Sequence, residues 1–415
     1  MLNKKGNREL AYVVKIDAIE PIIGSDNCEA AVVGGWKVMV RKGTFQSGDK
    51  AVYFEIDSKV PETDTYKFLA TKHYKIKTQK YTFGGKGNFV SQGLLMTFED
   101  FHHELDKYKD YFDEGYIYNL EVGTFLTDVL KVKYSVIEDN KRKVNTNKYI
   151  RMKQRNIKLF NKYKILQRIY KKNWGKKLLF LFLGKRKDIK ASFWPSWVIK
   201  TDEERVQNLP QFFPPDDTKW FVTEKIDGTS TTFTMKKRRR KKYDFYVCSR
   251  NVCFDKPEKE DKLFYETNVY TEMALKYDME KVLYKILYET PGLSEFLDFV
   301  TIQGETYGKS VQKRDYHMTG IDFMAFNLIY GDKQFGPRRL NPREMTDVLT
   351  QYKIPCVPIL DENFKLPNTI DEMVAYADGK SVIDNDYREG VVLRTYDAAN
   401  SFKAVSNIYL INKGE

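Results

Sequence analysis

The fold is decided by the stretch FVTEKIDGTSTTFTM, which spans residues 221–235. β-Branched and aromatic residues predict strands at FVTEKIDG and TTFTM, and the first of these contains Lys225-Ile226-Asp227-Gly228. A four-residue pattern with one free position occurs by chance in about one of ten chains of this length. The significance of the tetrapeptide therefore depends on the motifs that accompany it in the rest of the chain.

Five more short motifs come after it in chain order. They are Ser249-Arg250-Asn251, Gly304-Glu305, Phe323-Met324-Ala325-Phe326, Glu389-Gly390-Val391-Val392 and Ser401-Phe402-Lys403. Strand patterns at FVTIQGE, IDFMAFNLIY and GVVLRTY alternate irregularly with a helical pattern from about Tyr265 to Tyr288. Because there is no regular βαβ repeat, an α+β domain of antiparallel sheets and helices is expected from residue 192 onward.

The six motifs together resemble motifs I, Ia, III, IIIa, IV and V of the covalent nucleotidyltransferases. This superfamily comprises ATP- and NAD-dependent ligases and capping enzymes, and its members hold AMP or GMP on the lysine of K-x-D-G. The resemblance implies an ATP-grasp-like ligase domain over residues 192–415, with Lys225 as the nucleophile.

The chemistry explains why carboxylates accompany this lysine. A free lysine has a pKa of about 10.4 and is protonated at neutral pH. Lys225 therefore needs an electropositive setting, such as a bound divalent metal, to lose its proton. Asp227, Glu305 and Glu389 are suitable oxygen donors for Mg²⁺ or Mn²⁺, directly or through water. The alternative for the two glutamates is an ion-paired carboxylate at the end of a strand.

The remaining motif residues suit a nucleotide. Arg250 offers a fork of donors for phosphate or ribose oxygens, and Lys403 a point charge for the α-phosphate; either could instead be an ordinary strand-edge charge. Phe326 offers a flat face for a purine, or is simply core. Glu224 could accept a hydrogen bond from the adenine amino group and is the least specific of these assignments. Glu305 is expected to serve the nucleotide as well as the metal.

The first part of the chain has a different pattern. Short strands separated by turn residues are predicted at AYVVKI from Ala11, AAVVGGWKVMVRKG from Ala30, KAVYFEID from Lys50 and GNFVSQGLLM from Gly87. They favour a small antiparallel barrel, an OB-like nucleic-acid-binding module over residues 1–135. With 415 residues the chain exceeds one ordinary core, so at least two domains are expected.

Basic charge is concentrated between these two parts. The whole chain carries a net charge of +13, whereas residues 141–190 contain 19 Lys and Arg against the single acid Asp188, a local net charge of +18. Leu159, Tyr163, Leu166 and Tyr170 recur at helical spacing there, which predicts a basic helical insertion over residues 136–191. A solvated structural helix and an RNA-contacting arm both fit, and a membrane surface or a partner protein is the lesser alternative. The candidate nucleic-acid contacts are Lys162, Lys164, Arg168, Lys171 and Lys172.

The order of the domains favours one branch of the superfamily. DNA ligases and capping enzymes carry an OB domain after motif V, but only twelve residues follow Lys403. The segments GWKVMVRKGTFQSGDKAVYFEID and TDEERVQN resemble the fifth family of ATP-dependent RNA ligases, whose OB module comes first. Two departures stand out: Ser401 replaces the first lysine of the usual K-x-K of motif V, and Ser230 stands where a related branch has asparagine.

The resemblance implies an enzyme that joins RNA 3′-OH and 5′-phosphate ends, with nicks as the expected substrate, through lysyl-AMP and RNA-adenylate. ATP and Mg²⁺ or Mn²⁺ are the expected cofactors, and RNA, as a nicked duplex or an RNA/DNA hybrid, is the expected partner of a monomeric protein. A DNA-nick ligase, a capping guanylyltransferase and an inactive nucleic-acid-binding protein remain the alternatives.

Composition and motif order add two expectations. Scattered cysteines and the absence of a long apolar run predict an intracellular protein, cytoplasmic or nuclear, with no membrane association. Because all nucleotide motifs lie after residue 220, a fragment starting near Ser192 is expected to form lysyl-AMP without the OB module.

Overall fold

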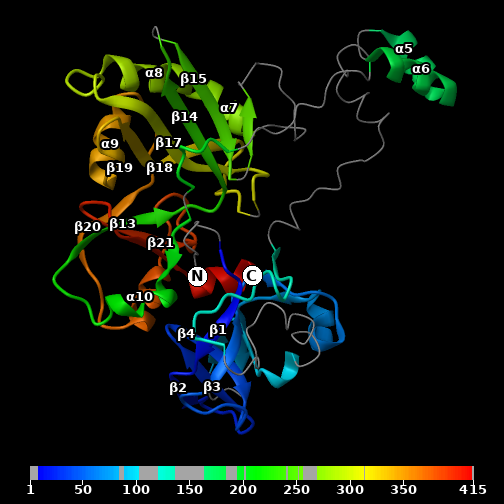
Figure 1. Ribbon diagram of the computed structural model, residues 1–415, viewed down its shortest axis with the longest axis vertical. Helices are drawn as coiled ribbons and strands as arrows, with labels where there is room; N and C mark the ends of the chain where they lie inside the picture. The colour runs from blue at the N-terminus through cyan, green and yellow to red at the C-terminus, as the bar shows by residue number, and fades with distance from the viewer. Residues whose placement is uncertain are drawn as a thin grey trace.

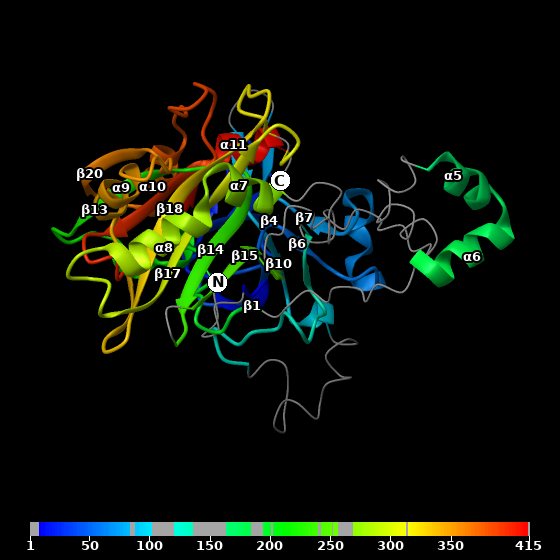
Figure 2. The same ribbon diagram turned by 90° about the horizontal axis from the view of Figure 1, so that it is seen from above.

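The structure is a computed structural model that describes residues 8–83, 88–101, 120–135, 163–183, 194–200, 202–239, 242–250, 252–255, 269–312 and 314–413. Figure 1 shows a small β-rich unit, built from the beginning of the chain, beside a larger unit that holds its second half. A pair of helices lies apart from both units in Figures 1 and 2.

The N-terminal unit is built of short antiparallel strands. They are β1 (Ala11–Lys15), β2 (Ala18–Pro21), β3 (Cys28–Val33), β4 (Trp36–Arg41), β5 (Lys50–Phe54), β6 (Ser58–Lys59), β7 (Lys75–Ile76), β8 (Gln79–Thr82), β9 (Asn88–Ser91), β10 (Leu94–Met96) and β11 (Lys133–Tyr134). The strands predicted at AYVVKI, AAVVGGWKVMVRKG, KAVYFEID and GNFVSQGLLM are confirmed. Their alternating apolar side chains enclose a core that includes Trp36 and Tyr53.

The larger unit contains two sheets, in which every pair of neighbouring strands is antiparallel except β12 with β22, which is parallel. One has the order β12-β22-β21-β13-β20 and the other the order β16-β15-β14-β17-β18-β19. The first sheet is formed by β12 (Glu204–Arg205), β13 (Lys219–Lys225), β20 (Ile359–Lys365), β21 (Gly390–Thr395) and β22 (Ser401–Val405). The second is formed by β14 (Thr229–Lys237), β15 (Tyr243–Ser249), β16 (Cys253–Asp255), β17 (Leu297–Gly308), β18 (Ile321–Asp332) and β19 (Gly336–Arg339).

Helices cover these sheets. The helices α7 (Val269–Lys276), α8 (Met279–Glu289) and α9 (Pro342–Thr350) pack on the six-stranded sheet, and α10 (Ile370–Ala377) packs on the five-stranded one. Capping boxes at Asn341 and Thr369 fix the starts of α9 and α10. The helical pattern predicted from about Tyr265 to Tyr288 is two helices that meet near Asp278, whose φ is +47°. The second half of the chain is therefore α+β, as predicted.

The two sheets are joined at Lys225-Ile226-Asp227-Gly228. Strand β13 ends at Lys225 in the five-stranded sheet, and β14 begins at Thr229 in the six-stranded sheet. The two predicted strands therefore lie in different sheets, and Lys225-Ile226-Asp227-Gly228 is the crossing between them. A side chain at Gly228 would meet the Thr306 carbonyl oxygen at 2.3 Å, so the crossing accepts only glycine there.

The basic insertion contains a helical hairpin of α5 (Lys164–Lys171) and α6 (Asn173–Leu183). Leu166 and Tyr170, from the predicted stripe, pack with Leu179 of α6. These two residues thus pack within the hairpin itself, whereas Tyr163 precedes α5 and is exposed. Leu159 lies outside the described residues. Within the part of the chain that the structure describes, no helix is long and apolar enough to span a bilayer.

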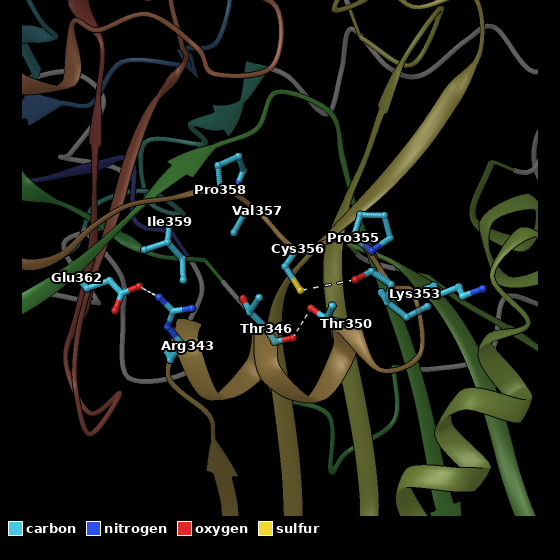
Figure 3. A pocket seen from close by; sticks show the side chains of 11 residues that line it. Arg343, Thr346, Thr350, Lys353, Pro355, Cys356, Val357, Pro358, Ile359 and Glu362 are labelled. Atoms are coloured by element: carbon cyan, nitrogen blue, oxygen red, sulfur yellow. Dashed lines mark hydrogen bonds and ion pairs between the residues drawn. The ribbon is translucent and has the colours of Figure 1, made fainter.

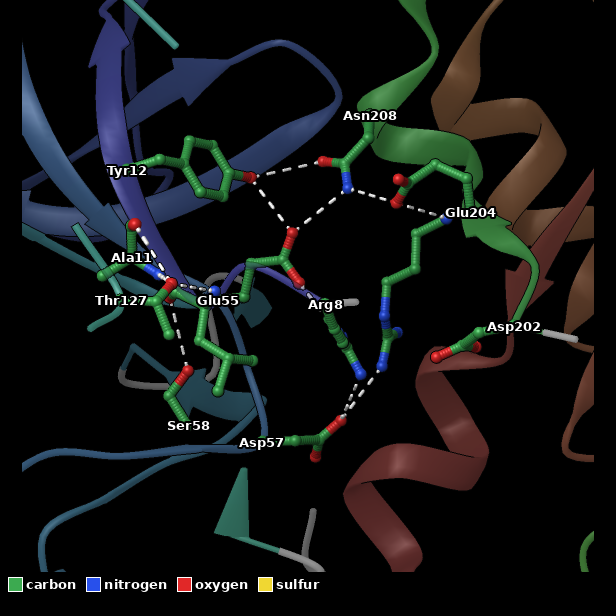
Figure 4. A network of polar contacts seen from close by, with 12 residues as sticks. Arg8, Ala11, Tyr12, Glu55, Asp57, Ser58, Thr127, Asp202, Glu204 and Asn208 are labelled. Carbon is green, nitrogen blue, oxygen red and sulfur yellow. Dashed lines mark hydrogen bonds and ion pairs between the residues drawn. The ribbon is translucent and has the colours of Figure 1, made fainter. Parts of the chain in front are cut away.

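A buried polar network ties the two units together through residues 202–208 (Figure 4). Asn208 accepts a hydrogen bond from Trp36 Nε1 at 2.7 Å and donates one to Glu55 Oε1 at 3.1 Å. Arg205 donates to Asp57 Oδ2 at 3.1 Å. Glu55 is fully buried, and burial alone would raise its pKa, but the positive charges around it, of which Arg8 contributes most and Arg205 is another, together outweigh burial and lower the pKa to about 2.

This network predicts acid-dependent stability. Because the folded-state pKa of Glu55 lies below that of the unfolded chain, its contribution is complete above about pH 4.5 and is lost as pH falls toward about 2. The shift corresponds to about 3 kcal/mol. Glu55→Gln should lower the free energy of unfolding at pH 7, and the difference from the parent should shrink in acid. Urea titrations at several pH values measure this, and a difference that does not depend on pH would contradict the assignment.

Candidate adenylylation site

Lys225 lies opposite Gly390 where β13 pairs with β21, which brings it beside Glu389. Its Nζ is 2.7 Å from Glu389 Oε2. Burial lowers the pKa of Lys225, but Glu389, Glu305 and Asp227 together outweigh burial and raise it. The side chain is therefore an ammonium ion in the protein alone, and a cation that neutralises these carboxylates would favour its free base.

Glu305 is the third carboxyl group close to Lys225. It lies on β17 opposite Ser230, and burial together with the nearby charges of Glu389 and Asp227 raises its pKa to about 8, although Lys225 acts in the opposite direction. Three carboxylates thus surround one lysine. This donor set fits a divalent cation, with Asp227, Glu305 and Glu389 as the residues that would hold it, directly or through water.

Asp227 is held by two tyrosines. Its backbone N–H donates to the Tyr316 hydroxyl at 2.7 Å, and its Oδ2 accepts a hydrogen bond from the Tyr409 hydroxyl. The carboxylate is almost completely buried. Sequence reasoning missed both tyrosines, because neither belongs to a motif and both are distant from Asp227 in the chain.

Arg250 and Lys403 meet at Asp202. Arg250 Nη2 donates to Asp202 Oδ2 at 2.5 Å, and Lys403 Nζ donates to Asp202 Oδ1 at 2.7 Å. Burial raises the pKa of Asp202, but Lys403 and Arg250 outweigh it and hold the pKa well below the ordinary value. Two cations from different sheets can therefore share one anion here, as phosphate recognition requires. Asp202 belongs to the TDEERVQN segment, but its contact with both cations was not predicted.

Glu224 and Phe326 lie near the same crossing. Glu224 is buried, its Oε2 accepts from the Val382 N–H at 2.9 Å, and its Oε1 has no hydrogen-bond partner among the described residues. Phe326 is half-buried and packs against a cluster that contains Ile226 and Val357. A buried acceptor without a donor close to an apolar cluster fits the amino edge and the face of an adenine.

The structure shows which residues surround Ser401 and Ser230, the two departures from the family pattern. Ser401 donates to Glu203, and its Oγ accepts a hydrogen bond from Arg339 Nη2 at 3.3 Å. Arg394 also pairs with Glu203. Positive charge therefore remains close to position 401, and Glu203 offsets part of it. Ser230 lies opposite Glu305 in the pairing of β14 with β17, so the two side chains are on the same face of the sheet.

The candidate nucleic-acid contacts belong to the basic insertion and not to this centre. Arg168, Lys171 and Lys172 are exposed on the α5–α6 hairpin. Lys164 begins α5, and Lys162 lies outside the described residues.

A cavity of about 540 Å³ lies beside α9. It is lined among others by Arg343, Thr346, Cys356 and Glu362 (Figure 3). Val357 lines this cavity and also packs in the cluster that contains Phe326.

The raised pKa of Glu305 predicts a change of stability with pH. Glu305 is protonated in the folded protein and ionised in the unfolded chain between about pH 4.5 and 8, so stability falls as pH rises through this range. In EDTA, the melting temperature of the parent should therefore fall relative to that of Glu305→Gln over this range. The exposed Glu289, changed to glutamine, is the control. Equal pH dependence of the parent and Glu305→Gln would contradict the crowding of carboxylates.

Comparisons with known proteins agree with this geometry. Residues 218–405 match the family model described as RNA ligase, and residues 10–97 match an OB-fold domain model. No curated protein matches the chain in sequence. Solved structures are similar in fold. The Naegleria gruberi RNA ligase with pyrophosphate is 27% identical to this chain and has a TM-score of 0.69, and the match covers 98% of this chain and 99% of that chain.

Two further structures of variants of that ligase are similar. One, with ATP and manganese, has 26% identity, a TM-score of 0.69 and coverage of 98% of this chain and 100% of that one. The other, with AMP and manganese, has 27% identity, a TM-score of 0.68 and coverage of 98% and 99%. The predicted order of an OB module before a nucleotidyltransferase domain is thus confirmed: the chain has an OB-fold domain followed by an RNA ligase domain, and it is similar over nearly its whole length to an RNA ligase of the covalent nucleotidyltransferase type.

Proposed function

We propose that the protein is an ATP-dependent RNA ligase that seals 3′-OH and 5′-phosphate ends at nicks through a lysyl-AMP intermediate. The observation that carries the proposal is Lys225 Nζ, 2.7 Å from Glu389 and surrounded by three carboxylates at the crossing of the two sheets. The Naegleria gruberi ligase structures with ATP or AMP and manganese support ATP as the nucleotide and Mg²⁺ or Mn²⁺ as the metal.

Three displacements at phosphorus account for sealing. The free base of Lys225 attacks the α-phosphorus of ATP, so a P–N bond forms as the bond to pyrophosphate breaks. A 5′-phosphate oxygen of RNA then attacks the same phosphorus, which regenerates the lysine and gives RNA-adenylate. Finally a 3′-hydroxyl attacks the 5′-phosphorus, loses its proton and expels AMP. A divalent metal would neutralise phosphate charge and favour the deprotonated lysine.

The chain's own residues would position these groups. Glu224 Oε1 would accept from the adenine amino group, and Phe326 would contact the purine face. Arg250 and Lys403, which Asp202 now holds together, would bind phosphate oxygens, and Glu305 would contact the nucleotide or its metal. Preorganised charges of this kind supply most of the stabilisation in phosphoryl-type transfer.

The nucleophile is tested by labelling. Protein incubated with radiolabelled ATP and Mn²⁺ should retain label through a denaturing gel, and Lys225→Ala should abolish it. The same variant should still join a nick whose 5′ end is already adenylylated, because that step does not require transfer from the lysine. Undiminished labelling of Lys225→Ala would refute this assignment, and label from GTP in place of ATP would favour a capping enzyme.

The parts outside the catalytic domain would bind RNA. We assign residues 1–135 to the OB-like module, 136–191 to the basic insertion and 192–415 to the adenylylation domain. The α5–α6 hairpin presents Arg168, Lys171 and Lys172 to solvent, and residues 163–183 contain no acidic side chain. A polyanion along this surface would release counterions from each phosphate that it neutralises.

The hairpin is tested by the salt dependence of binding to a nicked duplex. Each lost phosphate contact should flatten the slope of log affinity against log salt by about 0.7 to 0.9. Glutamine at Lys162, Lys164, Arg168, Lys171 and Lys172 should therefore flatten the slope by several units and leave labelling by ATP unchanged.

A control removes the exposed charges of Lys219, Lys281 and Lys353 from the catalytic domain. A slope equal to that of the parent in the hairpin variant would show that the hairpin is only structural.

A further inference from the structure

The C-terminal helix α11 (Asn407–Lys413) connects the OB-fold domain to the catalytic carboxylates. Leu410 is 2% exposed and packs, with Val405, in the core cluster of the OB-fold domain that contains Tyr53 and Trp36. Gln92 of the OB-fold domain donates to Asn407 Oδ1 at 2.9 Å. The helix is therefore anchored in the OB-fold domain by an apolar contact at Leu410 and a polar contact at Asn407.

The neighbouring residue on the helix reaches the catalytic site. The Tyr409 hydroxyl donates to Asp227 Oδ2, and the Tyr409 side chain is buried. Burial, reinforced by the charges of Glu389 and Asp227, raises the pKa of Tyr409 well above its ordinary value, so the hydroxyl remains a neutral donor. Consecutive helical residues point about 100° apart. Tyr409 and Leu410 can therefore serve two domains at once.

The start of α11 is fixed to the same site. The Ser406 N–H donates to the Glu389 carbonyl at 2.9 Å. The Ser406 hydroxyl donates to Asp378 Oδ1 at 2.6 Å and accepts from the Tyr409 N–H at 3.0 Å. These bonds fix the direction in which Tyr409 leaves the backbone. The phenol thus has a defined position relative to both Asp227 and Glu389.

We propose that Tyr409 is a positioning residue that orients the Asp227 carboxylate for the metal, and that the OB-fold domain supports it by anchoring Leu410. The inference rests on the proposed function, in which Asp227 serves the metal. A hydroxyl bound to one carboxylate oxygen restricts rotation of the group and leaves the other oxygen directed to its ligand. The OB-fold domain then contributes to the first chemical step as well as to RNA binding.

This contact changes one expectation from the sequence. A fragment that starts near Ser192 retains every nucleotide motif, but it lacks the barrel core around Leu410 and Val405. In such a fragment both apolar side chains face water, and α11 loses its anchor. Formation of lysyl-AMP should therefore depend on the OB-fold domain even though that domain contains no nucleotide motif.

The experiment uses the full chain and the variant Tyr409→Phe, which keeps the ring and removes the hydroxyl. The concentration of Mn²⁺ at half-maximal rate of lysyl-AMP formation should rise about tenfold, which is typical for loss of a hydrogen bond to a charged group. The rate at saturating Mn²⁺ should recover. The exposed Asn412, changed to alanine on the same helix, is the control.

A second readout requires no turnover. The rise in melting temperature caused by Mn²⁺ with the α,β-methylene analogue of ATP should be smaller for Tyr409→Phe than for the parent and for Asn412→Ala. Gln92→Ala, which removes a contact between domains and no group from the catalytic site, should shift the metal dependence in the same direction.

The outcomes separate the two proposals. If the parent forms lysyl-AMP at Lys225 and Tyr409→Phe has the same dependence on Mn²⁺ as the parent, the positioning role is wrong and the proposed function stands. If the Mn²⁺ dependence shifts in Tyr409→Phe but not in Gln92→Ala, the proposed anchor between the OB-fold domain and Asn407 is wrong. If the parent forms no adduct with ATP, the proposed function itself fails.

Discussion

The antiparallel pairing of β13 with β21 is the constraint on which the rest of the catalytic site depends. It sets Lys225 opposite Gly390, so the adjacent Glu389 lies beside the lysine Nζ. Gly390 has a φ of +155°, and a side chain there would meet the Ala404 carbonyl oxygen at 2.2 Å, so the close approach of β21 and β22 requires glycine. Once these strands are in register, β22 places Lys403 beside them and the crossing carries Asp227 toward the second sheet.

The segment at residues 202–208 has a comparable role between the domains. Asp202 binds the two cations of the catalytic domain, Arg205 binds Asp57 of the OB-fold domain, and Asn208 joins Trp36 to Glu55. Residues 202–208 and helix α11 are thus two separate connections from the barrel to the catalytic centre. A substitution in the barrel can therefore alter the catalytic site even if the substituted residue does not contact the nucleotide.

Much of this arrangement was predictable because motif chemistry and strand patterns are local. The fold class, the order of the two domains and the convergence of Lys225, Glu305 and Glu389 could be inferred from the sequence. Tyr409 could not be found in this way, because its function depends on packing between a C-terminal helix and a strand crossing nearly two hundred residues earlier. Asp202 could be noticed in TDEERVQN, but its two cationic partners come from distant strands. The helix α5 of the insertion is amphipathic as predicted, but the periodicity of the sequence cannot show that its apolar face packs against α6.

The central claim is that Lys225 carries AMP during turnover. The most direct measurement is tandem mass spectrometry of the protein after incubation with ATP and Mn²⁺, with the adduct located by fragmentation of the peptide that contains Lys225. We expect one AMP on the Lys225 Nζ, lost when pyrophosphate or a nicked RNA with a 5′-phosphate is added. AMP on another residue, or no adduct under conditions in which RNA is joined, would contradict the claim.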